Sequence, residues 1–208
     1  MREIPTLFKK KIDKNNNYLG VMPRYNININ PEQHLAVTIK YDGLPCAIIN
    51  GRIYKRYDIN SECKRPNGII FCDGYIPTRK HNFSWVPCCR DYIEDKYYWN
   101  GYDRGFTYQN DDLVSEHKLC DGTYELIGKN IKNNPYDLQI NVLIRHGADI
   151  IEIITLANEP LKVYNYFRDM LDIAWIEGVV LWTIDDNSNI IKPIATICKK
   201  DFRFKWGK

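Results

Sequence analysis

Short apolar runs and alternating apolar and polar positions recur along most of the chain, and this pattern predicts a structure dominated by β-strands. Residues 36–60 are expected to hold three consecutive strands: Val37–Ile39, Ala47–Ile49 and Arg52–Asp58. Asn50-Gly51 is typical of the two-residue turn that joins hairpin strands. We expect the resulting meander to bring Lys40, Arg56 and Lys55 near one another.

The second half of the chain carries further β-type segments. They are expected at Asp121–Gly128, Ile140–Ile144, Ile150–Leu156, Ile176–Trp182 and Ile194–Ile197. The first of these segments begins with Asp121-Gly122, which predicts a turn that leads into the strand.

Two helices and two less regular regions complete the expected outline. Apolar residues at helical spacing predict a helix over residues 159–174, and a shorter helix is predicted over residues 111–119. Residues 60–110, interrupted by Pro and Gly, are expected to form an irregular insert. Within it, Tyr97-Tyr98-Trp99 is interpreted as a strand or a set of buried loop anchors. Residues 1–35 form a polar N-terminal lead-in.

Composition narrows the class of protein only moderately. The 208 residues suffice for one large domain, and 44% hydrophobic with 26% charged residues is ordinary for a globular protein. A net charge of +3 permits nucleic-acid binding without requiring it. We find no signal peptide, no apolar run long enough to span a membrane and no Cys-x-x-Cys pair, so we expect reduced cysteines and a cytoplasmic or nuclear location, in a cell or of viral origin.

The strongest candidate for covalent chemistry is Lys40, in the segment Lys40-Tyr41-Asp42-Gly43. A free lysine amine is a poor nucleophile at neutral pH, but partial burial or a nearby cation frees its lone pair. Gly43 would allow the chain to turn tightly beside a ligand. The alternative is an edge-strand lysine before a turn. Arg56 has a planar guanidinium group whose N–H donors suit a phosphate or the edge of a ribose. The alternative is that Arg56 is a solvated strand residue.

Several other polar residues lie in β-type segments and invite a function. Glu125 needs a partner if it is buried, and either a ribose diol or a structural arginine would serve. Glu177, at the start of an apolar strand, is a candidate ligand for Mg²⁺ or Mn²⁺. Lys199 and Lys200 could neutralise a triphosphate, or they form a solvated tail. His146 is interpreted as a structural hydrogen-bonding residue rather than a catalytic one.

Taken together, five segments resemble, in order and rough spacing, the motifs of the covalent nucleotidyltransferase superfamily of ATP-dependent ligases and capping enzymes. These segments are Lys40–Gly43, Tyr54–Asp58, Gly122–Gly128, Glu177–Val180 and Ile197–Phe202. The chain is most similar to the RNA ligases that include the vertebrate cellular 5′–3′ RNA ligase and its bacterial, phage and giant-virus relatives. The segments that carry that closer similarity are Tyr54–Asp58, Trp85–Pro87, Tyr124–Tyr136 and Arg145–Ala148.

The resemblance implies one α+β nucleotidyltransferase domain over residues 1–208, with antiparallel sheets around an ATP cleft, flanking helices and no C-terminal OB-fold. It implies that Lys40 attacks ATP to form lysyl-AMP, that AMP passes to the 5′-phosphate of an RNA, and that a 3′-hydroxyl seals the strand. ATP, Mg²⁺ or Mn²⁺, and RNA with 5′-phosphate and 3′-hydroxyl ends are the expected ligands. A monomer without membrane association is expected.

Residue roles follow from the same resemblance. Lys40 is the implied nucleophile, Arg56 contacts the nucleotide sugar or phosphate, Glu125 the ribose hydroxyls, and Glu177 the metal or its waters. The implied ATP-binding residues are Ile39, Lys40, Asp42, Gly43, Arg56, Glu125, Glu177, Lys199 and Lys200.

The fifth motif departs from the family pattern. Thr196 and Cys198 occupy positions where relatives usually carry two lysines. Strand alternation is expected to place both on one face with Lys200, and Lys199 on the other. Either Lys199 or Lys200 substitutes, with or without Lys192, or one chemical step is impaired. Thr196 and Cys198 therefore leave open an RNA-end-binding protein with an impaired site. A guanylyltransferase or a DNA-nick ligase is the rival enzyme within the same superfamily.

Overall fold

The structure, a computed structural model, describes residues 4–28, 30–60, 67–71, 81–109, 112–115 and 119–207. It is a mixed α+β protein with mostly antiparallel sheets and few helices, which confirms the predicted class at that level. Contacts divide the chain into two compact units, described separately below. Unit 1 comprises Asp42–Ala148, and unit 2 comprises Ile4–Tyr41 with Asp149–Lys208. The assignment of one domain to residues 1–208 stays a prediction.

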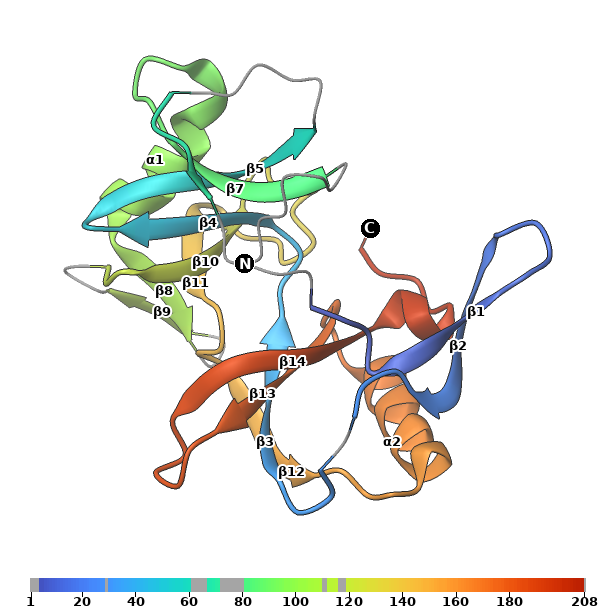
Figure 1. The fold of residues 1–208 in the computed structure, drawn as a ribbon. Coiled ribbons are helices and arrows are strands. Elements are labelled where there is room, and N and C mark those ends of the chain that lie inside the picture. Colours follow the sequence, from blue (N-terminus) through green and yellow to red (C-terminus); the bar gives the residue numbers. More distant parts are fainter. Residues whose placement is uncertain are drawn as a thin grey trace. The chain divides into compact units, whose positions relative to one another are not determined.

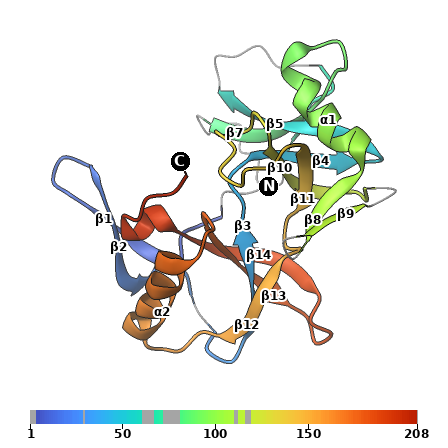
Figure 2. The ribbon, with the colours of Figure 1, turned by 180° about the vertical axis from the view of Figure 1, so that it is seen from behind.

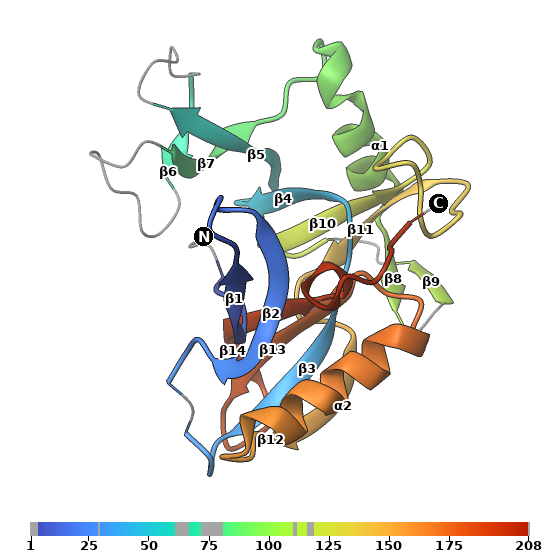
Figure 3. The same cartoon turned by 90° about the vertical axis from the view of Figure 1, so that its right-hand side faces the viewer.

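Unit 2 is built on a four-stranded antiparallel sheet in the order β12-β3-β13-β14 (Figure 1). Its strands are β3 (His34–Lys40), β12 (Ile150–Thr155), β13 (Gly178–Ile184) and β14 (Ile190–Cys198). Helix α2 (Pro160–Ile173) lies along this sheet, as Figure 3 shows, and the 3₁₀ helix η2 (Lys199–Phe202) follows β14. Strands β1 (Phe8–Ile12) and β2 (Tyr18–Tyr25) pair as a separate two-stranded ribbon.

The core of unit 2 forms because alternate strand residues and every third or fourth helix residue are apolar. Val163, Phe167 and Leu171 lie on one stripe of α2 and are buried. They pack with residues from one face of the sheet, including Val37 and Leu181. The helix begins with Pro160, as the sequence predicted, because proline needs no hydrogen-bond partner for its nitrogen in the first turn.

Unit 1 is built on a six-stranded sheet in the order β11-β10-β4-β5-β7-β6, visible from behind in Figure 2. Its strands are β4 (Leu44–Ile49), β5 (Arg52–Asn60), β6 (Ile70–Phe71), β7 (His81–Pro87), β10 (Gly122–Gly128) and β11 (Asn141–Arg145). A 3₁₀ turn, η1 (Ile93–Asp95), leads into α1 (Lys96–Arg104), and β8 (Phe106–Gln109) pairs with β9 (Asp112–Ser115). The predicted turn at Asn50-Gly51 is confirmed, since both residues have positive φ angles of 52° and 68°.

The two faces of the unit 1 sheet differ in character. One face packs against α1 through a buried cluster that includes Cys46, Tyr124 and Tyr98. Residues paired across neighbouring strands lie on the same face of a sheet. Glu125 pairs with Pro45 in β4, and Ala47, on that same face of β4, continues the pairing through β5 to β7. Glu125 and Arg56 therefore lie together on the face opposite α1. The residues with candidate chemistry in this unit therefore lie on the face away from α1.

Three predictions about local structure are wrong. The segment predicted as a helix over residues 111–119 contains strand β9 at Asp112–Ser115, while 111 and 116–118 lie outside the described residues. Tyr97-Tyr98-Trp99 belongs to α1 rather than to a strand or loop, because its aromatic side chains give that short helix one packed side. Strands β3 and β4 do not pair with each other, since β3 pairs with β12 and β13, and β4 with β5 and β10.

The chain passes between the units at two sequence positions, Tyr41/Asp42 and Ala148/Asp149. Inside unit 2 these two crossing segments are tied together. The Tyr41 hydroxyl donates to Asp149 Oδ2 at 2.7 Å, and the backbone N–H of Ile39 donates to the Asp149 carbonyl at 3.1 Å. The end of β3 that carries Lys40 is thereby fixed. None of the described helices is long and apolar enough to cross a membrane.

Candidate active site

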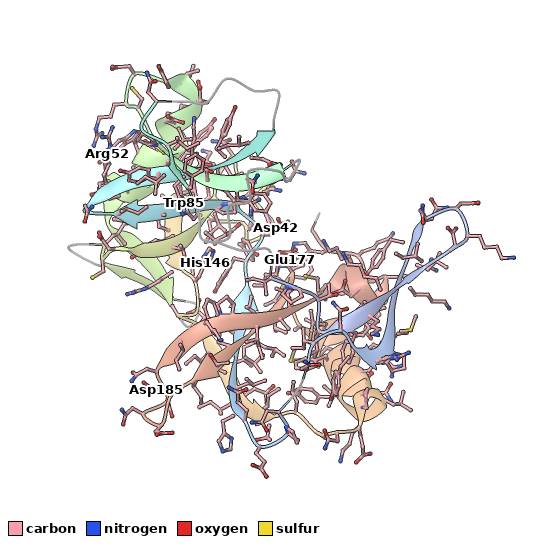
Figure 4. The ribbon with its side chains drawn as sticks, in the orientation of Figure 1. Asp42, Arg52, Trp85, His146, Glu177 and Asp185 are labelled. Atoms are coloured by element: carbon pink, nitrogen blue, oxygen red, sulfur yellow. The ribbon has the colours of Figure 1, made fainter. Side chains whose placement is uncertain are left out.

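Lys40 is the last residue of β3, and its amine forms an ion pair with the carboxylate of Glu177. Glu177 immediately precedes Gly178, which is the cross-strand partner of Lys40 in β13. Both side chains are partly buried. Two residues that are 137 positions apart in the sequence, and that were both predicted as site residues, are thus adjacent in unit 2 (Figure 4 labels Glu177).

Gly178 explains why these strands can approach so closely beside Lys40. A Cβ atom at this position would lie 2.3 Å from the Ile197 carbonyl oxygen and 2.8 Å from Cys198 Cα. Real side chains do not make such contacts, so the position needs glycine. Because Glu177 directly precedes this glycine, the close packing of β13 on β14 also fixes the backbone position from which the Glu177 side chain extends.

Cys198, one of the two departures from the family pattern, is buried and lies opposite Gly178 in the ladder. Burial raises the pKa of its thiol to about 12, against the opposing influence of the Lys40 charge. The thiol is therefore neutral at physiological pH and supplies neither a cation nor a reactive thiolate. Thr196, the other departure, is bound through its backbone to residues 5–7, with Leu7 N–H donating to the Thr196 carbonyl at 2.9 Å.

Lys199 and Lys200 have different surroundings. Lys199 is only 6% exposed, and its amine donates to the Leu171 carbonyl in the last turn of α2 at 2.5 Å. That carbonyl has no partner within the helix, so the lysine satisfies it and complements the negative end of the helix dipole. Lys200 is exposed, and its charge acts on the Cys198 thiol. Of the two lysines, Lys200 is the one whose amine remains available to a ligand.

In unit 1, the carboxylate of Glu125 has a partner on each oxygen. Oε1 accepts from the backbone N–H of Gly43 at 3.0 Å, and Oε2 lies 3.1 Å from His146 Nε2. His146 Nδ1 lies in turn 3.0 Å from the Thr123 hydroxyl. Nε2 can donate to Glu125 while Nδ1 is bonded to the Thr123 hydroxyl, so the ring is held from both sides. The partner of Glu125 is a histidine and a backbone amide, not the arginine that the sequence left open.

Gly43 is required by the same arrangement. A Cβ atom there would lie 2.2 Å from the Leu126 carbonyl oxygen, so the segment after Lys40 runs directly along β10. The preceding residue is also held, since the Asp42 N–H donates to the Tyr136 hydroxyl at 2.7 Å. Lys132 lies 4.0 Å from the Asp42 carboxylate. The loop from Gly128 to Tyr136 therefore supports the Lys40–Gly43 segment on its unit 1 side.

Arg56 is exposed on the same sheet face as Glu125, and its guanidinium lies over the Phe83 ring, 4.7 Å from the ring centre. Its cross-strand partner is Trp85, which Figure 4 labels. Lys55 points to the other face and forms an ion pair at 2.5 Å with Asp95, a fully buried carboxylate. The expectation that Lys55 joins the site is therefore wrong, because alternation turns it toward α1. Lys40 and Arg56 belong to different sheets and different units, so the meander that was expected to join them does not exist.

No group of three or more His, Cys, Asp or Glu side chains suited to holding a metal occurs among the described residues. Protein-bound Mg²⁺ commonly uses one or two carboxylates and takes its remaining ligands from substrate phosphates and water. A single carboxylate such as that of Glu177 is sufficient for this mode of binding, because carboxylate oxygens are the hard ligands that Mg²⁺ prefers. The donor set is compatible with a metal that arrives with a nucleotide.

Two residues that position the site were not singled out from the sequence in that role. His146 was interpreted as a structural hydrogen-bonding residue, and the structure gives it Glu125 as its partner. Tyr136 was quoted only as part of a similar segment, and its hydroxyl holds Asp42. No local pattern identifies either contact, because each joins segments more than twenty residues apart.

A scan of protein-family models found no match to this chain, and a search of curated proteins found no relative.

Proposed function

We propose that this protein is an ATP-dependent RNA ligase with a nucleotidyltransferase fold, and that it joins 5′-phosphate and 3′-hydroxyl RNA ends through Lys40-AMP. The observation that carries the proposal is the ion pair between Lys40 and Glu177. Both residues belong to segments that resemble superfamily motifs, and a chance pair of short motifs has no reason to meet. The Gly43–Glu125 hydrogen bond supports the proposal in the same way, since it joins the first and third of these segments.

In the first step, the Lys40 nitrogen attacks the α-phosphate of ATP. A nitrogen–phosphorus bond forms, the bond from the α-phosphorus to the bridging oxygen breaks, and pyrophosphate leaves with that electron pair. The amine must first lose a proton, and the Glu177 carboxylate that already accepts its hydrogen bond is the acceptor within reach. A divalent metal held by Glu177 would stabilise the negative charge on the phosphates.

The remaining residues orient the nucleotide. Glu125 accepts from the ribose hydroxyls, which requires its carboxylate to face the sugar while Gly43 and His146 hold it. Arg56 and Lys200 supply positive charge, and Ile39, Asp42 and Gly43 line the segment around the nucleophile. Lys199 is not assigned a nucleotide contact in this proposal, because its amine is bound to the end of α2.

In the later steps, the 5′-phosphate oxygen of an RNA attacks the phosphorus of Lys40-AMP and releases the lysine. A 3′-hydroxyl then attacks the phosphorus of the RNA end, a phosphodiester forms, and AMP leaves. Each step exchanges one bond at phosphorus for another, so no oxidant or further co-reactant is needed. Preorganised positive charge near the phosphates would lower each barrier.

The experiment that tests the proposal is incubation with ATP labelled at the α-phosphate and with Mg²⁺ or Mn²⁺. We expect a covalently labelled protein from ATP, and no label in Lys40→Ala. Glu177→Gln keeps the shape of the side chain but removes the charge, and should reduce labelling strongly. Label from GTP instead of ATP would favour a guanylyltransferase, and sealing of nicked DNA but not RNA would favour a DNA-nick ligase.

One observation favours a second candidate function. Thr196 and Cys198 bring no charge, and Lys199 is engaged with α2, so this region offers the nucleotide fewer cations than the family pattern does. A protein that binds RNA ends without sealing them is the resulting alternative. It predicts RNA binding by protein free of AMP, with no labelled intermediate under any of the conditions above.

A further inference from the structure

Residues 8–25 form a separate antiparallel ribbon of β1 and β2, which we call the basic ribbon. One part of it is anchored in the core of unit 2, where Phe8 and Val21 are buried and Phe8 stacks with Tyr25 at 5.9 Å between ring centres. The remainder is mostly exposed. Figure 1 shows the turn of this ribbon standing clear of the other elements of the same unit.

The ribbon concentrates the positive charge of the whole chain. It contains five cations, Lys9, Lys10, Lys11, Lys14 and Arg24, and one acid. Its formal charge is +4 while the chain carries +3, so all the other residues together are net negative by one. Within the part of the chain that the structure describes, none of these five cations is in an ion pair.

The one acid of the ribbon does not neutralise these cations. The Asp13 carboxylate accepts from the backbone N–H groups of Asn15 and Asn17 at 2.8 and 2.7 Å, and from the Asn17 side-chain amide at 2.8 Å. These hydrogen bonds, chiefly the one from the Asn17 side chain, lower the pKa of Asp13. The acid therefore closes the turn, and the lysines around it face solvent without a counter-charge.

The basic ribbon is attached directly to the segment that follows β14. The Tyr18 hydroxyl donates to Asp201 Oδ1 at 2.7 Å, and Asp201 Oδ2 accepts from the Cys198 N–H at 2.8 Å. Gly20 has φ +97°, and a Cβ atom there would lie 2.7 Å from the Asp201 carbonyl oxygen, so only glycine allows this approach.

That attachment connects the ribbon to the proposed nucleophile. Cys198 lies opposite Gly178 in β13, and Gly178 lies opposite Lys40 in β3. Lys200, the exposed cation after β14, belongs to the same helix η2 as Asp201. The ribbon is therefore attached at the end of the unit 2 sheet where Lys40 and Lys200 lie.

We propose that the basic ribbon binds the phosphate backbone of the RNA strand whose end is delivered to Lys40. The inference rests on the proposed function for the identity of the polyanion. Lysine is suited to this role because its flexible point charge contacts phosphates without reading sequence. Tyr18 and Met22, which are 40% and 36% exposed, add flat or adaptable apolar surface against which unpaired bases can stack. A lipid surface would use the charge but gives no reason for continuity with Lys40.

The test compares two variants of the full chain with equal charge loss. The ribbon variant is K9Q/K10Q/K11Q/K14Q, and the control is K96Q/R104Q/K162Q/R168Q, which removes four exposed cations from α1 and α2. Binding of a 5′-phosphorylated single-stranded RNA is measured over a series of salt concentrations. Each lost phosphate contact reduces the slope of log affinity against log salt by about 0.7, so the ribbon variant should lose up to about 3. The control should keep the wild-type slope.

Measurement of lysyl-AMP formation without RNA separates this inference from the function on which it rests. The ribbon variant should form as much lysyl-AMP as wild type, while sealing less RNA. Ribbon-dependent RNA binding by a wild-type protein that forms no lysyl-AMP would uphold the ribbon and overturn the ligase. Equal losses of RNA binding in both variants, unchanged binding in the ribbon variant, or wild-type binding to anionic phosphatidylserine vesicles but not to RNA would each overturn the inference.

Discussion

Replacement of Lys199 separates a structural lysine from a ligand-binding one. Lys199→Met keeps the buried aliphatic stem but removes the ammonium that donates to the Leu171 carbonyl. A hydrogen bond from a charged donor contributes about 1.5–3 kcal/mol, and the helix-end charge is part of that gain. The variant should therefore unfold about 1.5–3 kcal/mol more easily, which lowers the melting temperature by about 3–10 °C.

Lys200→Met is the matched comparison, because it makes the same chemical change one residue later at an exposed position. Its stability should lie within about 0.5 kcal/mol of wild type. Its rate of lysyl-AMP formation should fall at least about tenfold, which corresponds to about 1.4 kcal/mol of lost transition-state stabilisation. Lys162→Met, an exposed change on α2, should alter neither property.

Urea unfolding followed by tryptophan fluorescence measures the first quantity, and labelling with α-phosphate-labelled ATP measures the second. Wild-type stability with loss of labelling in Lys199→Met would contradict a structural role for Lys199, since Lys199 would then be the nucleotide ligand. Labelling at the wild-type rate in Lys200→Met but not in Lys199→Met would contradict it as well.

Three further outcomes follow from the described contacts. Asp95→Ala removes the acceptor of both the partly buried Lys55 ammonium and the Cys89 N–H, and should destabilise the protein by about 2–4 kcal/mol in urea unfolding; an effect smaller than about 1 kcal/mol would contradict this. His146→Ala should raise the KM for ATP in lysyl-AMP formation more than His146→Gln does, because glutamine keeps an N–H donor for Glu125; equal effects would mean that this hydrogen bond does not position the carboxylate. The Cys198 thiol, with its pKa raised to about 12, should react with iodoacetamide at pH 8 only after unfolding, whereas exposed Cys120 reacts in the folded protein, and comparable rates would contradict the burial.

Much of the local structure could be predicted from residue pattern, because strand alternation and turn chemistry act over few residues. The positions of β10, β13 and α2 agree with the expected segments to within about two residues. Failures occurred where packing overrode local preference. Residues 96–104 form a helix because Tyr98 and its neighbours fill one side of the unit 1 core.

Sheet membership could not be predicted in the same way. Consecutive strands β3 and β4 were expected in one meander, yet β3 pairs with β12 and β13, and β4 pairs with β10 as well as with its neighbour β5; all of these partners except β5 lie more than seventy residues later in the sequence. Pairing over such distances depends on which faces bury one another, and a single strand pattern does not contain that information. Candidate residues could be named individually, but the Lys40–Glu177 and Glu125–His146 contacts depend on this long-range pairing.

The orientation of neighbouring charged residues illustrates the same limit. Lys55 and Arg56 were expected near one another, but they lie on opposite faces of the sheet, and no sequence pattern indicated that Asp95 would bind Lys55. The sequence offered both Lys199 and Lys200 as candidate ligands, but in the structure the amine of Lys199 is bound to the end of α2. Exposure and partner, rather than residue type, distinguish the members of each pair.

The measurement that tests nucleotidyl transfer through Lys40 is the location of AMP on the protein. Purified protein is incubated with ATP and Mg²⁺, digested, and mapped by mass spectrometry under conditions that preserve the phosphoramidate bond. AMP is expected on the peptide that contains Lys40, with the modified amine at that residue, and it should be lost on addition of RNA with a 5′-phosphate. AMP on a different lysine, or unmodified Lys40 in protein that was shown to be free of AMP beforehand, would contradict transfer through Lys40.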